Sequence, residues 1–85
     1  MNKNINYFDL WFEDKKSMLA TMAKNMASDL SAGYDYYGKS IQAQIKVIDD
    51  YKAQFDNDMK WLAMMDETQS NRWCYMDMLR RGVIE

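Results

Sequence analysis

Residues 39–66 read KSIQAQIKVIDDYKAQFDNDMKWLAMMD, and this stretch decides the fold. Its apolar residues recur in steps of four and three, with one gap at Lys52, and they are Ile41, Ile45, Ile48, Phe55, Met59 and Leu62. This is the period of an α-helix, and it holds over more than three heptads. One face of a long helix is therefore apolar and needs cover. The spacing predicts a helix over about 39–65.

A second stretch with the same period lies upstream. Asn6 can act as an N-cap, with Asp9 in the first turn, where the helix dipole favours an acid. The apolar stripe that follows is interrupted only by Lys15, and it contains Phe8, Trp11, Phe12, Met18, Leu19, Met22, Met26 and Leu30. Gly33 and Gly38 then break the pattern, as expected of a helix C-cap and a turn. We predict a first helix over about 7–30.

Two long amphipathic helices joined by a short loop are expected to pair as an antiparallel hairpin. In such a hairpin the position numbers of facing residues have a nearly constant sum. That sum is 70 or 71 for Leu30–Ile41, Met26–Ile45, Met22–Ile48, Phe12–Met59 and Phe8–Leu62. The same register sets Lys15 opposite Phe55 and Lys52 opposite Leu19, which predicts a polar step of two lysines whose stems pack while their ammonium groups reach water.

The C-terminal part carries a weaker break at 67–71, which contains neither glycine nor proline. We expect a turn there, capped by Ser70 or Asn71, although the second helix could also continue through it. A last helix over about 72–81 would place Trp73, Met76 and Leu79 on one side, end on basic residues and be capped by Gly82. The predicted fold is therefore all-α: one domain over 1–85, a long antiparallel helical hairpin closed by a short C-terminal helix.

The composition argues against catalysis and against bound metal or cofactor. The 85 residues include no histidine and one cysteine, which leaves no disulfide and no structural zinc site. Paired carboxylates are neighbours in sequence and point about 100° apart on a helix, and no phosphate-binding glycine motif occurs. Cys74, beside Trp73, is expected to be a small buried apolar residue. We predict a protein that is not an enzyme and needs no cofactor.

The same sequence has no apolar run of the roughly 18 residues that a membrane span needs, and its first residues do not resemble a secretory signal. The expected compartment is the cytoplasm. The net charge of −2 argues against bulk electrostatic binding to nucleic acid. Binding to another protein is the class that is left.

Three groups of residues are candidate contacts for a protein partner. The first is the tyrosine cluster of the connection, because tyrosine is frequent at interface hot spots. The second is the end of the hairpin that gathers the tryptophans. The third is the acidic part of the second helix, where carboxylates could stand in for phosphates. Packing over the loop, core packing and a solvated helix face are the alternative explanations. The candidates are Tyr34, Tyr36, Tyr37, Trp61, Trp73, Asp49 and Asp56.

In its size, its Met-, Tyr- and Asn-rich composition and its lack of a catalytic set, the chain resembles accessory proteins carried by phages and mobile elements. Some of these inhibit host defence nucleases by binding them. The resemblance implies an inhibitor of a host nucleic-acid-handling protein. Two alternatives stay open: a structural helical homodimer that pairs its surplus Met and aromatic surface, and a small DNA-binding accessory protein that uses Arg72, Arg80 and Arg81.

Overall fold

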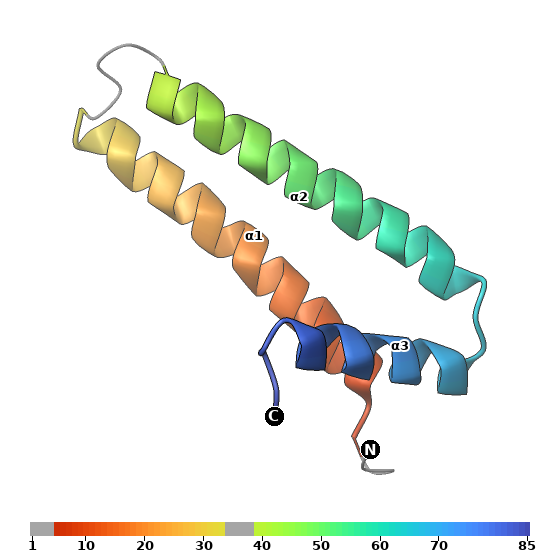
Figure 1. Ribbon diagram of the computed structural model, residues 1–85. Helices are drawn as coiled ribbons and strands as arrows, with labels where there is room; N and C mark the ends of the chain where they lie inside the picture. The colour runs from red at the N-terminus through yellow and green to blue at the C-terminus, as the bar shows by residue number, and fades with distance from the viewer. Residues whose placement is uncertain (1–4, 34–38) are drawn as a thin grey trace.

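Three helices make up the fold, and the computed structural model describes residues 5–33 and 39–85. They are α1 (Tyr7–Ser31), α2 (Lys39–Ala63) and α3 (Glu67–Arg80). Helices α1 and α2 run antiparallel, and α3 crosses the end of this hairpin where α1 begins and α2 ends (Figure 1). No strand occurs in the described part of the chain. The predicted all-α hairpin with a short closing helix is confirmed.

The ends of the helices are defined by local hydrogen bonds. The Oδ1 atom of Asn6 accepts from the backbone N–H of Asp9 at 3.2 Å, so the predicted N-cap of α1 is confirmed. Gly33 and Gly82 follow α1 and α3 with φ of 75° each, a left-handed conformation that favours glycine. After α3, the N–H of Val83 reaches the carbonyl of Met78 at 2.9 Å, which completes a Schellman motif.

The break between α2 and α3 lies earlier than predicted. Helix α2 ends at Ala63, and α3 begins at Glu67 instead of near residue 72. The cap is Asp66, whose Oδ1 accepts from the N–H of Gln69 at 2.8 Å. An aspartate cap followed by a glutamate suits a helix start, so the polar residues 67–71 continue the first turns of α3. The predicted cap, Ser70 or Asn71, is therefore wrong, and Asn71 serves a different helix instead.

The molecule is elongated, and its core lies at one end. The Cα atoms extend over 49 × 24 × 17 Å with a radius of gyration of 15.9 Å, where a compact chain of this length has about 12 Å. The core contains the buried residues at the crossing of the three helices, which are Tyr7, Trp11, Leu62, Cys74 and Met78. Away from α3 the hairpin is only two helices thick (Figure 1).

Two apolar stripes of the sequence are less buried than their spacing suggests. Helix α3 buries Cys74 and Met78, whereas Met76 and Leu79 are exposed, because the helix turns Cys74, Met78 and the polar Asp77 inward. In the hairpin, Leu30 and Ile45 are about half exposed although the predicted register places them in the seam. Near α3 the seam is tightly packed, and the rings of Phe12 and Phe55 lie 5.6 Å apart.

Candidate interaction surfaces around a buried polar junction

Trp11 is the centre of the core. Its side chain is fully buried, and its ring meets those of Phe55 at 5.5 Å and Trp73 at 5.7 Å, both edge to face. Such contacts add stability beyond the area they bury. The indole N–H is not left unpaired, because it donates to Oδ2 of Asp77 at 3.0 Å. Trp11 therefore joins all three helices.

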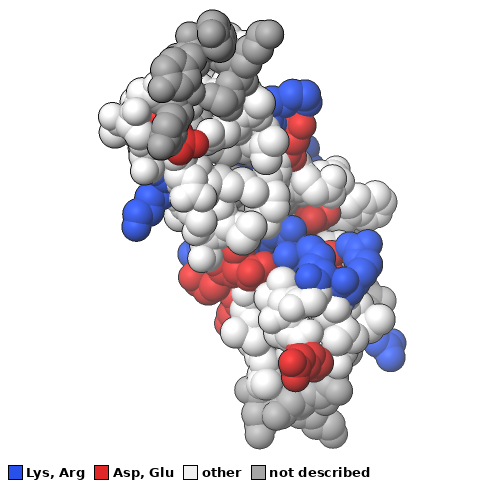
Figure 2. Space-filling model, turned by 60° about the vertical axis from the view of Figure 1, so that its left-hand side comes forward, with Lys and Arg blue, Asp and Glu red and all other residues white. Residues whose placement is uncertain are grey.

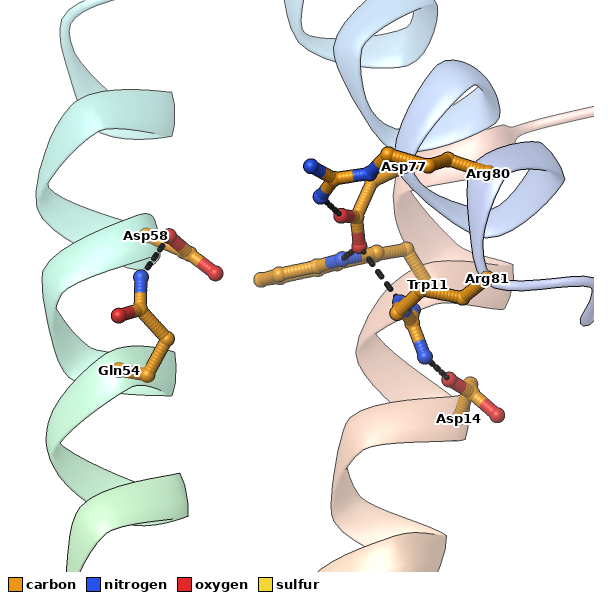
Figure 3. A network of polar contacts seen from close by, with 7 residues as sticks. All are labelled: Trp11, Asp14, Gln54, Asp58, Asp77, Arg80 and Arg81. Carbon is orange, nitrogen blue, oxygen red and sulfur yellow. Dashed lines mark hydrogen bonds and ion pairs between the residues drawn. The ribbon is translucent and has the colours of Figure 1, made fainter.

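Asp77 lies at the middle of a polar junction between α1 and α3 (Figure 3). Arg80 donates to its Oδ1 at 2.6 Å, and the Nε of Arg81 donates to its Oδ2 at 3.0 Å. Arg81 also reaches Oδ2 of Asp14 in α1 at 3.1 Å. Burial alone raises the pKa of the Asp77 carboxyl, but the hydrogen bonds from Arg80, Trp11 and Arg81 outweigh it and hold the pKa below its usual value.

Lys15 is buried beside this junction and does not reach out to water as predicted. Only 7 % of it is exposed, and its ammonium lies 4.8 Å from the ring centre of Tyr51 and 5.8 Å from that of Trp11. Burial, and then the nearby charge of Arg81, lower the pKa of Lys15. Lys52, by contrast, is exposed. The predicted step of two lysines is therefore a single buried cation held between aromatic faces.

The chemistry of the junction is that of a structural contact. Three donors hold the carboxylate of Asp77 in its ionised form, whereas a general acid or base needs a pKa near neutral pH. Burial raises the pKa of the Cys74 thiol to about 12, so this buried cysteine stays protonated and unreactive, as expected from the sequence. Among residues 5–33 and 39–85, no group of side chains is arranged to hold a metal ion.

A different surface lies on the outer side of α3. We call it the α3 surface, and define it by two adjoining shallow hollows lined by Met65, Gln69, Arg72, Trp73, Met76, Asp77 and Arg80. Met76 is 55 % exposed at its centre, and Trp73 is partly exposed while its inner side packs on the core. The spacing of Gln69, Trp73, Met76 and Arg80 is that of one helical face. Sequence periodicity identifies this stripe but gives no sign that it faces outward.

A second apolar surface runs between the two long helices. We call it the hairpin groove; it has a volume of about 420 Å³ and is lined by Met22, Asn25, Asp29, Ala43, Gln44, Val47 and Ile48. Gln44 donates to Oδ2 of Asp29 across the groove at 2.7 Å. On the face drawn in Figure 2, blue and red side chains gather around the middle of the molecule, and wide white areas lie beyond them.

The candidate contact residues have different surroundings in the structure. Tyr34, Tyr36 and Tyr37 lie outside the described residues. Trp61 is 56 % exposed at the end of α2, whereas Trp73 is shared between the core and the α3 surface. The acidic candidates Asp49 and Asp56 precede Trp61 in α2.

The acidic candidates share one exposed face of α2. Asp49 and Asp56 are seven residues apart, which places them on the same side of the helix. Lys52 and Lys60 are also exposed, and each lies four residues from Asp56. The face therefore alternates in sign, and does not present the continuous negative charge of a nucleic-acid backbone.

The chain matches no protein-family model, no curated protein and no solved structure. No helix in the described part of the chain is long and apolar enough to cross a membrane.

Proposed function

We propose that the chain is a non-enzymatic protein–protein interaction module that binds its partner through the α3 surface. The observation that carries this proposal is an outward-facing apolar stripe between two arginines. Met76 and Trp73 form the apolar part, and Arg72 and Arg80 stand on either side of it. Tryptophan and arginine are the residues most frequent at binding hot spots, and methionine adapts to partners of irregular shape.

The arrangement of charge indicates the kind of partner. Arg72 is exposed and forms no ion pair with the residues that the structure describes, and the side chain of Arg80 is 78 % exposed although it contacts Asp77. An apolar anchor with acidic neighbours would fill the hollow and pair with these cations. The partner we infer is therefore a protein segment that carries an aromatic or aliphatic residue flanked by Asp or Glu.

Direct binding to DNA fits these observations less well. Of the three arginines that the sequence offers, Arg81 is held by Asp77 and Asp14, which leaves two exposed cations for phosphates, Arg72 and Arg80. Neutralised cations contribute little to phosphate binding, which depends on the number of charges that replace counterions. The narrower hypothesis of an inhibitor of a host nucleic-acid-handling protein stays a prediction, and the α3 surface is where we would look for that contact.

Selection from a random displayed peptide library tests the proposal without knowledge of the source organism. The wild-type chain is expected to enrich peptides with an apolar anchor next to Asp or Glu. Met76→Glu places a charge in the centre of the α3 surface and is expected to abolish this binding. The matched control is Ala27→Glu, an exposed position of α1 away from this surface.

Two results would contradict the proposal. One is the absence of any enriched peptide for the wild-type chain. The other is enrichment that is the same for the wild type and for Met76→Glu. Circular dichroism of both variants shows whether the helices are intact, and we expect them to be, because both positions are exposed.

A further inference from the structure

We infer that the hairpin groove is a self-association surface, and that two copies of the chain pair through it to form a four-helix bundle. This surface is distinct from the α3 surface, and its occupant is a second copy. The proposal rests on where the groove lies, on how much area the monomer exposes and on the chemistry of the lining residues.

The groove continues the face that α3 covers. In α1, Lys15, Met22 and Asp29 follow at intervals of seven, and so do Gln44, Tyr51 and Asp58 in α2. Residues seven apart lie on nearly the same side of a helix. At the α3 end of these two rows, Lys15 and Asp58 are buried. At the other end, Met22, Asp29 and Gln44 line the open groove, so this face of the hairpin is covered over only part of its length.

The exposed area of the monomer is larger than its mass predicts. The chain exposes 6426 Å² for 10.1 kDa, whereas a compact monomer of this mass exposes about 5300 Å². If each of two copies buried the difference of roughly 1100 Å², the pair would bury about 2200 Å², which is in the range of permanent homodimers. The open groove is a part of the fold where some of this area can be covered.

The lining of the groove suits a copy of itself. Two-fold pairing sets the same surface against itself, so the surface must not repel its own copy. Met22, Ala43, Val47 and Ile48 are apolar, and the one carboxylate of the lining, that of Asp29, already accepts from Gln44. On α2 just outside the lining, Lys46 and Asp50 neutralise each other at 2.8 Å. Two hairpins that face each other with such stripes form the layout of a four-helix bundle.

The residue composition of the groove differs from that of the α3 surface. Its lining contains no tryptophan and no arginine, residues that are enriched at the hot spots of interfaces with other proteins. Its aliphatic lining resembles the more apolar interfaces of homodimers. Val47, at 55 % exposure, is the large apolar residue that a partner would cover most effectively there.

Sedimentation equilibrium of the full chain at micromolar concentrations tests the inference. The wild type is expected at twice 10.1 kDa. Val47→Glu is expected to raise the dissociation constant about a hundredfold or more, because symmetry buries the added carboxylate twice. Ala43→Arg, at a second exposed position of the lining, is expected to act in the same direction. Ala27→Glu and Met76→Glu serve as controls and are expected to remain dimeric.

Two outcomes would overturn the inference. A wild-type chain that is monomeric over the whole concentration range excludes a dimer of this kind. A dimer that both groove variants leave intact, or that only Met76→Glu dissociates, uses another surface. A monomeric wild type does not bear on peptide binding by the α3 surface, so this inference and the proposed function can fail separately. Unchanged circular dichroism of the groove variants shows that loss of the dimer is not loss of fold.

Discussion

The indole nitrogen of Trp11 donates a buried hydrogen bond of 3.0 Å to Oδ2 of Asp77, across 66 positions of the sequence. This bond joins the start of α1 to the end of α3. Arg81, which also donates to Asp77, reaches Asp14 of α1, so two polar contacts centred on this junction hold the closing helix on the hairpin. A buried polar group that loses its partners is costly, and this determines what each change at the junction is expected to do.

Replacement of Asp77 is expected to be the most damaging polar change. Asp77→Ala leaves the indole N–H of Trp11 without its acceptor and Arg81 without its nearest carboxylate. The expected loss in the free energy of unfolding is about 3 kcal/mol or more. Arg80→Ala is the matched control, and about 0.5 kcal/mol or less is expected because its side chain is largely exposed. Urea unfolding followed by circular dichroism measures both, and similar losses for the two variants would refute the role given to Asp77.

Asn71 provides a cap to a helix other than its own. Its Oδ1 accepts from the backbone N–H of Phe8 at 3.0 Å, so α3 satisfies a donor in the first turn of α1. Asn71→Ala is expected to lower the free energy of unfolding by about 1 kcal/mol. Gln69→Ala removes an exposed amide side chain two residues earlier and is expected to leave stability nearly unchanged. If Gln69→Ala is as destabilising as Asn71→Ala, the loss is not due to the cap.

The buried charge of Lys15 is expected to lower the free energy of unfolding. Lys15→Met keeps a long side chain between the rings of Tyr51 and Trp11 and removes the charge, so we expect a gain of about 1 kcal/mol near neutral pH. Lys52→Met changes an exposed lysine and is the control.

The pH dependence of Lys15 has a defined sign. Its pKa in the folded state is below the ordinary lysine value of 10.5. Between these two values the unfolded chain binds more protons than the folded chain, so this lysine makes stability rise with pH there. The difference in stability between Lys15→Met and the wild type is therefore expected to shrink as the pH approaches 10.5. A difference that stays constant with pH would show that the amine is not desolvated.

Cys74 is expected to destabilise the fold in alkali. The pKa of its thiol rises from the ordinary value of 9.0 to about 12 in the folded chain, where burial favours the neutral form. The unfolded chain therefore loses this proton first, and stability falls as the pH rises from 9.0 toward 12, by about 1.4 kcal/mol per unit. Cys74→Ala removes this contribution, at the constant cost of a small cavity. Chemical unfolding of both proteins across this pH range isolates the thiol, and parallel curves would contradict the prediction.

The hairpin was predictable because it depends on local signals. The apolar period of residues 41–62, the Asn6 cap, Gly33 and Gly82 each act within a few residues, and the structure confirms them. The inward face of α3 was not predictable in this way. Helical spacing groups Met76 with Trp73, but the face that packs is chosen by contacts with α1, where Trp11 offers an N–H to Asp77. A burial pattern that includes Lys15, Asp58 and Asp77 cannot be read from hydropathy.

The candidate surfaces, too, were predictable in part from local signals and in part depend on contacts between helices. Sequence composition indicated surplus methionine and aromatic residues, and the structure assigns some of them to the surface, as at Trp61 and Met76. Which apolar residues stay outside depends on how far α3 reaches along the hairpin. That length follows from the helix start at Asp66 and the stop at Gly82, and the sequence pattern placed the first of these too late.

The position of α3 at one end of a long hairpin has a consequence for amide hydrogen exchange. Near α3, an amide proton is protected by the aromatic core and by the junction, so its exchange requires the whole fold to open. In the far half of the hairpin, where Ile41 is the buried apolar residue and Leu30 and Ile45 are half exposed, separation of two helices is sufficient. We therefore expect two cooperative units of unequal strength in the 85 residues, and cover of the hairpin groove by another copy would slow exchange in both, because opening of the whole fold also separates the copies.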